Sequence, residues 1–364
     1  MHDSRTLSER LHLDLPLLLG LVLLCGVGLI VLYSACGENT DLIQRQGVRM
    51  LIAFGVMFIL AQIAPSHLLF WTPWLYGLGV ALLVSVLLFG DIVQGAQRWL
   101  QVGPVKFQPS ELAKLSVPMM IAFFLADRSL PPRLGRIVAG LILVALPTFL
   151  IARQPDLGTS LLIASSGIFV LFLAGIGWRL IALAGVLAAS SLPALWYVMH
   201  DYQRRRVLTF FDPEQDPLGA GYHIIQSKIA IGSGGIYGKG WLNGTQSQLE
   251  FLPERSTDFV FAVFSEEFGL LGVITLLMIY LFIVLRGLYI AINAQDVYGR
   301  LVAGSLILTF FVYVFVNIGM VSGLLPVVGV PLPLVSYGGT SVVTLMAGFG
   351  LVMSIHTHRR LLSD

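Results

Sequence analysis

Asp258 occupies the position in this sequence where a carboxylate is best placed to act as a base. It ends the long polar stretch 200–258, and an apolar run begins at once with Phe259. A carboxylate at a water–membrane boundary is partly desolvated, which raises its pKa toward the range that a general base needs. A helix cap is the alternative, because Ser256, Thr257 and Asp258 are all residue types that favour the N-cap position. The local pattern leaves both interpretations open.

Glu111 and Lys114 form a second candidate, a charge pair near the start of another apolar run. Residues three apart share one face of a helix and can pair. The pair would lie within about 6 Å of the outer membrane boundary. Charged residues inside a membrane usually face a cavity or the bundle interior. The pair is therefore either a charged wall of an outward-facing substrate cavity or a self-neutralised contact that fixes helix packing.

The glycine-rich run 232–240 contains Lys239 and has two interpretations. It does not match a phosphate-binding P-loop, because Gly240 follows Lys239 where Ser or Thr is required. Glycine-rich backbone can still form an anion-binding nest to which Lys239 would add charge. The alternative is a flexible loop without a ligand. Glu266 and Glu267 cannot face one direction on a helix, so one is expected to pair inside the bundle and the other is unexplained.

The composition identifies the elements that must position these groups. Of 364 residues, 56% are hydrophobic and 12% charged, whereas soluble domains have about 25% charged residues. We expect an all-α polytopic membrane protein, because helices satisfy their own backbone hydrogen bonds in lipid. The net charge of +2 gives no indication of a nucleic-acid partner. About ten membrane-spanning helices are predicted, at 15–35, 46–64, 70–90, 110–127, 136–152, 157–175, 178–198, 259–285, 299–322 and 334–355.

The orientation follows from Lys and Arg in the short loops. One side carries ten of them and the other four, namely Arg45, Arg98, Lys106 and Arg153. The richer side holds both ends of the chain. We therefore expect cytoplasmic N and C termini, with the loop 200–258 between helices seven and eight outside. The chain is predicted to form a single domain, 1–364.

Polar residues of the other connections gather on the same outer side as this loop. They lie in 97–99, 108–111, 153–156 and 331–339. This one-sidedness favours chemistry at the outer face over transport through the midplane, where transporter sites usually lie.

Taken together, these segments resemble the SEDS family, and within it the elongation-type members. Six segments in the same order carry the resemblance, and the tail 354–359 is similar to the elongation type as opposed to the division type. The resemblance covers essentially the whole chain. The six segments are 95–99, 107–114, 154–159, 225–235, 253–259 and 331–339.

The resemblance implies a peptidoglycan glycosyltransferase that polymerises lipid II into β-1,4 glycan strands during cell elongation and so maintains cell shape. Lipid II is a disaccharide-peptide on undecaprenyl pyrophosphate. The implied location is the bacterial cytoplasmic (inner) membrane, with the active site facing the periplasm. The family's essential loop aspartate falls on Asp258 and its cavity charge pair on Glu111 and Lys114. Trp99 and Asp156 match further required positions.

The implied reaction needs a base on the acceptor hydroxyl and positive charge on the departing pyrophosphate. Lys114, Arg98 and Lys239 are candidates for that charge, as is Mg²⁺ or Mn²⁺ bound with the pyrophosphate. No protein metal site and no organic cofactor are expected. The implied partners are a class B penicillin-binding protein, which is a transpeptidase, and the elongation machinery. The rival functions are a lipid II flippase or other transporter, and a non-catalytic platform for a wall transpeptidase.

Overall fold

The computed structural model describes residues 11–93, 96–102, 105–127, 130–199, 201–215, 219–248 and 254–358. Most of these residues are helical, and ten helices correspond one to one with the ten predicted spans. They are α2 (Leu15–Ala35), α3 (Thr40–Gln62), α4 (Pro65–Phe89), α5 (Pro109–Ala126), α6 (Leu134–Ala152), α7 (Leu157–Leu173), α8 (Trp178–Val198), α12 (Val260–Ile292), α13 (Val297–Val321) and α14 (Thr340–Thr357).

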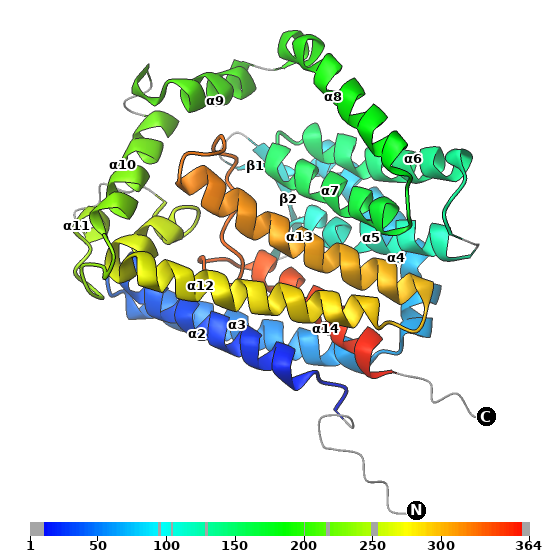
Figure 1. The fold of residues 1–364 in the computed structure, drawn as a ribbon, viewed down its shortest axis with the longest axis horizontal. Helices are drawn as coiled ribbons and strands as arrows, with labels where there is room; N and C mark the ends of the chain where they lie inside the picture. The colour runs from blue at the N-terminus through cyan, green and yellow to red at the C-terminus, as the bar shows by residue number, and fades with distance from the viewer. Residues whose placement is uncertain are drawn as a thin grey trace, which may run out of the picture.

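Eight of these ten helices are long and apolar enough to cross a membrane. The other two are α7, with 17 residues, and α8, whose apolar part is short. The prediction of a helical, polytopic membrane protein is thereby confirmed. Figure 1 shows α2, α3, α12, α13 and α14 running side by side through the bundle, while α8 and α9 form an arch away from it.

Four helix bounds differ from the sequence prediction by five residues or more, namely the starts of α3, α4 and α14 and the end of α12. Helix α3 begins at Thr40 and not at 46, because the Asn39 side chain accepts hydrogen bonds from the amides of Asp41 and Leu42 and so caps the helix. Arg45, which hydropathy assigned to a loop, is therefore helical. Helix α12 continues to Ile292 and includes Arg286, whose guanidinium binds the Asp14 carboxylate at 2.6 and 3.0 Å.

The first and last described residues lie together at one end of the bundle. The His12 and His358 rings stack at 3.9 Å, and His356 Nε2 lies 3.3 Å from Asp14 Oδ2. An even number of spans requires this arrangement. Which membrane face this end meets remains a prediction from the charge distribution.

The stretch 200–258 is far more structured than the predicted loop, although residues 200, 216–218 and 249–253 lie outside the described part of the chain. It contains α9 (Asp201–Phe211), the 3₁₀ turn η1 (Pro213–Gln215), α10 (Ala220–Ser233) and α11 (Thr245–Gln248). Helix α10 lies against α12 and α13, and the buried Ser227 hydroxyl donates to the Val321 carbonyl at 2.7 Å. The treatment of 1–364 as one domain stays a prediction.

A small antiparallel sheet between α4 and α5 was not anticipated. Its strands are β1 (Asp91–Val93), β2 (Ala96–Val102) and β3 (Val105–Phe107), in the order β1-β2-β3. Strand β2 carries two of the predicted site residues, Arg98 and Trp99. Both residues therefore lie on the central strand of this sheet.

Candidate active site

Asp258 does not cap α12. The helix begins at Val260, its N-cap residue is Phe259, and the cap makes no side-chain hydrogen bond. The hydroxyl of Thr257 instead donates to Glu254, both to the carboxylate at 2.7 Å and to the backbone carbonyl at 3.2 Å. The helix-cap interpretation of the sequence is thus wrong, and the Asp258 carboxylate is left for another role.

The backbone at Asp258 is fixed by a buried side chain of α13. The Asn317 amide donates to the Asp258 carbonyl at 2.9 Å and to the Val330 carbonyl at 2.7 Å. Gly329 lies directly against the carboxylate: a Cβ at Gly329 would stand 3.3 Å from Asp258 Oδ2, and its φ is +74°. The aspartate is therefore held between the start of α12 and the connection that follows α13.

The electrostatic surroundings of Asp258 suit a general base. Burial raises the pKa of Asp258, the Glu254 carboxylate adds to this rise and Arg206 of α9 opposes both, which together gives a pKa of about 6. A base with a pKa near the working pH combines a useful deprotonated fraction with a useful proton affinity. Helix α9, which the sequence analysis treated as loop, thus contributes a tuning charge.

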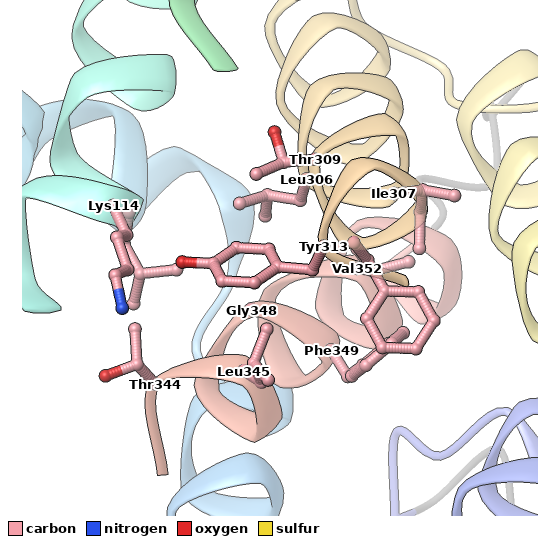
Figure 2. Close-up of a pocket in the computed structure, with 12 residues that line it drawn as sticks. Lys114, Leu306, Ile307, Thr309, Tyr313, Thr344, Leu345, Gly348, Phe349 and Val352 are labelled. Atoms are coloured by element: carbon pink, nitrogen blue, oxygen red, sulfur yellow. The ribbon is translucent and has the colours of Figure 1, made fainter. Parts of the chain in front are cut away.

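Lys114 and Glu111 form the ion pair that their spacing predicted, at 2.8 Å. Both side chains are nearly buried, at 13% and 6% exposure respectively. The Lys114 ammonium lies 5.6 Å from the centre of the Tyr313 ring, and Figure 2 shows Tyr313 extending from α13 toward Lys114 of α5. The second Glu111 oxygen, Oε2, is buried and has no hydrogen-bond partner among the described residues.

A cavity of about 40 Å³ lies beside this pair, between α5, α13 and α14. Apart from Lys114, Thr309, Tyr313 and Thr344, its lining is apolar (Figure 2). A smaller cavity of about 10 Å³ shares Lys114 and Tyr313 and is otherwise lined mainly by the connection 331–336. Lys114 of the ion pair therefore lines internal space.

The connection 331–337 also ties the ion pair to the Asp258 segment. The Ser336 hydroxyl donates to the Thr257 carbonyl at 2.5 Å, and the Tyr337 amide donates to the Ser256 carbonyl at 2.8 Å. One short segment thus lines the cavity at Lys114 and holds the residues that precede Asp258. Two of the segments that the sequence predicts to lie on one side, 256–258 and 331–337, are therefore in direct contact.

Arg98 of strand β2 and Asp156, the N-cap residue of α7, form an ion pair. Asp156 caps α7 through the Thr159 amide at 3.2 Å, and its carboxylate also lies 3.8 Å from Arg98 Nε. The Gln108 amide, which precedes α5, donates to the same carboxylate at 3.4 Å. Trp99 follows in β2, partly exposed and paired in register with Asp91. Asp156 therefore positions the start of α5, on which Glu111 lies.

Lys239 lies in a separate cluster. Its ammonium binds Glu266 Oε1 and Thr245 Oγ1, both at 2.7 Å. Glu266 also accepts from the Gln246 amide at 3.0 Å, and it stands about 12 Å along the chain of α12 from Asp258. The structure thus gives Lys239 a carboxylate partner where the sequence analysis expected a substrate anion.

The glycine-rich run is built into α12 and does not form an anion nest. Helix α12 breaks at Gly269 (φ 64°, ψ −164°). The amides of Lys239 and Gly240 donate to the carbonyls of Glu266 and Glu267 at 3.0 and 2.9 Å. In the other direction, Leu270 and Leu271 donate to Gly235 and Ile236 at 2.9 and 3.1 Å. The run thereby replaces the helical hydrogen bonds that the break removes.

This insertion also explains the two adjacent glutamates that the sequence left open. Glu266 anchors the loop through Lys239, whereas Glu267 accepts a hydrogen bond from the Ser34 hydroxyl of α2. Sequence reasoning missed Asn317, Tyr313 and Arg206, although an asparagine inside an apolar run is itself a signal of buried polar contacts.

Comparisons with known proteins agree with this architecture. Residues 9–361 match the family model for the FtsW, RodA and SpoVE cell cycle proteins. The peptidoglycan glycosyltransferase MrdB of Escherichia coli K12 is 57% identical over 99% of this chain and 98% of its own length. The peptidoglycan glycosyltransferase RodA of Treponema pallidum is 32% identical over 95% and 98%.

Two solved structures are similar throughout. A chain from a peptidoglycan synthase complex that coordinates polymerisation and crosslinking superposes with a TM-score of 0.83 at 35% identity, over 96% of this chain and 98% of that one. The rod shape determining protein RodA of Thermus thermophilus gives a TM-score of 0.73 at 29% identity, over 96% and 98%. The sequence match and the shared architecture show that this chain belongs to the FtsW/RodA/SpoVE, or SEDS, family of bacterial membrane proteins.

Proposed function

We propose that this protein is a peptidoglycan glycosyltransferase that polymerises lipid II during cell elongation, with Asp258 as the general base. Family membership and the relatives named peptidoglycan glycosyltransferase support the reaction. The observation that carries the assignment of the base is the position of Asp258: it caps no helix, has a pKa near 6 and is held by Asn317.

In the proposed reaction, the 4-hydroxyl of the acceptor sugar attacks the anomeric carbon of the donor sugar. The new carbon–oxygen bond forms as the bond to the lipid pyrophosphate breaks, so the α-linked donor gives a β-1,4 product by inversion. The hydroxyl proton passes to the Asp258 carboxylate, and the pyrophosphate departs with its lipid. Positive charge must meet the departing oxygen, since that is where negative charge develops.

Lys114 is the proposed source of part of that charge, because it lines the cavity between α5, α13 and α14. Arg98 is held against the Gln154–Asp156 connection and Lys239 is bound to Glu266, so both have a carboxylate partner, as Lys114 has in Glu111, but neither of them lines this cavity. We retain Arg98 and Trp99 as contacts of the sugar-phosphate portion at the rim of the sheet. Lys239 ranks last, because it lies with Glu266 and Thr245 in a cluster separate from Asp258 and Lys114.

A divalent cation fits this site only as a companion of the pyrophosphate. The described residues contain no group of three or more His, Cys, Asp or Glu side chains that could hold a metal ion. Mg²⁺ is commonly bound through one or two carboxylates together with substrate phosphates. Glu254, which is exposed beside Asp258, is the carboxylate that could contribute to such a site, and the cation would neutralise charge on the pyrophosphate.

We further propose that the active site faces the periplasm and that both termini are cytoplasmic. The excess of Lys and Arg at the end of the bundle that holds the termini supports this orientation. Tyr237 is 81% exposed on the opposite end. A Tyr237→Cys variant without Cys25 and Cys36 should react with an impermeant maleimide in intact spheroplasts. Labelling only after lysis would show that the protein has the opposite orientation in the membrane.

The transpeptidase partner is proposed to lie along α12. Beyond the break at Gly269, this helix exposes a continuous apolar stripe that includes Leu270, Ile274, Leu277, Leu281 and Leu285, each at least 40% exposed. A single membrane helix of a class B penicillin-binding protein would cover it, in keeping with the similarity to a complex that couples polymerisation with crosslinking. Failure to co-purify with the cognate transpeptidase in mild detergent would count against this surface.

The decisive test uses the purified protein alone in detergent with lipid II. Formation of glycan strands supports the enzyme. Movement of lipid II across vesicles without strand formation would support the flippase. Inactivity in both assays, with intact binding of the transpeptidase, would support the non-catalytic platform.

A further inference from the structure

A second basic site lies on α3, away from the residues assigned to the reaction. An open concavity of about 600 Å³ is lined by Asp41, Gln44, Arg45, Val48 and Arg49. These positions follow the helical repeat, so all five share one face of α3. Arg45 and Arg49 lie about 8 and 14 Å from the first residue of the helix, within the apolar segment that crosses the membrane.

The two arginines are not neutralised by the protein. No ion pair joins either guanidinium to a carboxylate in the described part of the chain, and Asp41 is the single acid that lines the concavity. By contrast, Lys114 is paired with Glu111 at 2.8 Å. Charges within a membrane span are costly and mark ligand sites by default. The net positive charge of this concavity therefore calls for an anion from outside the chain.

The neighbouring connection adds to this positive potential. Arg49 lies over the Tyr337 ring at 4.8 Å, and its guanidinium carbon is 4.0 Å from where a Cβ of Gly339 would stand. Gly339 is the N-cap residue of α14 and provides no side-chain cap. A helix N-terminus is itself electropositive and binds anions. A guanidinium placed at such an end is stabilised by an anion that contacts both.

The surroundings favour an anion that belongs to a lipid. Val48 lines the concavity and is 56% exposed, and Leu51 and Ile52 of the next turn are 73% and 54% exposed. The surface thus changes from two arginines to bare apolar side chains along one helix. A lipid with a phosphorylated head and a hydrocarbon tail matches this order of charge and apolar surface. A soluble anion would contact the arginines alone and leave the apolar side chains uncovered.

We propose that the Arg45–Arg49 concavity binds the pyrophosphate of a polyprenyl lipid in the outer leaflet. The inference rests on the proposed function, because joining two lipid II molecules brings together two lipid pyrophosphates. The reaction then requires two cationic sites. Lys114, already paired with Glu111, serves one pyrophosphate, and the unpaired arginines of α3 hold the other.

The test measures binding and does not depend on turnover. Wild-type protein and the variant Arg45→Gln/Arg49→Gln are placed in phosphatidylcholine nanodiscs with radiolabelled undecaprenyl pyrophosphate. Arg133→Gln/Arg136→Gln is the matched control, because Arg133 is exposed and Arg136 lies over the Phe124 ring at 5.2 Å, as Arg49 does over Tyr337. All binding is measured in an Asp258→Asn background, which prevents turnover.

We expect wild type and control to bind two molecules of the probe. The α3 variant should keep the site at Lys114 and bind at the other at least about tenfold more weakly, since it loses two charge-assisted contacts. Equal binding by all three proteins overturns the proposal. Inorganic pyrophosphate or phosphatidylglycerol that displaces the probe at equal concentration overturns the assignment to a polyprenyl lipid.

If the double variant does not fold, the single Arg45→Gln change on the exposed side chain gives the same comparison. If the protein with Asp258 intact does not polymerise lipid II, while binding still depends on Arg45 and Arg49, the proposed function is refuted and this site remains.

Discussion

The Asn317 amide joins the carbonyl of Asp258, 2.9 Å away, to the carbonyl of Val330, 2.7 Å away. Asn317 is fully buried in α13, so a single side chain holds the start of α12 against the connection that follows α13. That connection carries Gly329, where a Cβ would stand 3.3 Å from Asp258 Oδ2, and continues to Ser336, which binds the residue before Asp258. The position of the proposed base therefore depends on α13 as much as on its own helix.

Replacing Asn317 with Leu should lower stability and activity together. Two buried carbonyls would lose their donor, at about 1–3 kcal/mol for each unsatisfied group. Thermal unfolding in detergent measures the first effect and lipid II polymerisation the second. Asn293→Leu is the control, because Asn293 is exposed and its amide donates only to the Tyr289 carbonyl one turn away. Similar melting temperatures for the two variants would contradict the positioning role of Asn317.

Asp258→Asn should abolish most polymerisation while the protein folds normally. The asparagine keeps the shape of the side chain but cannot take a proton from the acceptor hydroxyl. General bases contribute roughly 10²–10⁴-fold in rate, so a loss of at least about two orders of magnitude is expected. Strand length and amount are measured on gels with labelled lipid II. Activity within a few-fold of wild type would move the search for the base to Glu254.

The pH dependence of polymerisation should report the carboxylate of Asp258. Its pKa is raised to about 6 by burial and by Glu254, and a base works only when deprotonated. The rate should therefore fall about tenfold for each pH unit below 6. Glu254→Gln removes a negative charge that raises this pKa, so the fall should move to lower pH. Arg206→Gln removes a positive charge that lowers it, so the fall should move to higher pH. Shifts in the same direction would exclude these groups as the tuning charges.

The helices and the boundary position of Asp258 could be predicted because both are local properties of the chain. Runs of about twenty apolar residues identify spans, and a step from polar to apolar residues locates a carboxylate at the interface. The capping alternative was equally local, and the structure rejects it because the chain turns between Glu254 and Phe259 before α12 begins.

What the sequence could not predict depends on pairing between distant segments. Lys239 looked available for a substrate because its partner, Glu266, is 27 residues away on α12, whereas Lys239 lies in the loop between α10 and α11. Arg45 looked like a loop residue because hydropathy falls at 40–45, although the Asn39 cap shows that the helix already includes it. The small sheet was missed because its strands have three to seven residues and lie between two long apolar runs.

The Glu111–Lys114 pair gives a test that separates packing from substrate contact. Replacing a buried ion pair with apolar residues is often tolerated or even stabilising. The variant Glu111→Leu/Lys114→Met should therefore insert and fold, yet lose polymerisation, because the cavity beside Tyr313 would have no cation. Gel filtration and thermal unfolding check the fold, and the lipid II assay checks the activity. Normal turnover by this variant would show that the pair only supports helix packing and does not contact the substrate.

Gly238→Ala tests whether the glycine-rich run is an integral part of α12. The φ of Gly238 is +80°, and a Cβ there would stand 2.1 Å from the Glu267 carbonyl oxygen. The loop would have to withdraw from α12, which would also remove the amides that Lys239 and Gly240 donate to the break in the helix.

Gly235→Ala is the matched control for this change, because Gly235 also has a positive φ, +57°, but meets nothing within 4 Å. It should cost only the strain of that backbone conformation, about 1–2 kcal/mol. Gly238→Ala should therefore lower the melting temperature well beyond Gly235→Ala. It should also free Lys239 from Glu266, which proteolysis of the segment between α10 and α12 would detect. Equal melting temperatures for the two variants would indicate that the glycine-rich run is a loose loop. An anion-binding role for Lys239 would then again be an alternative.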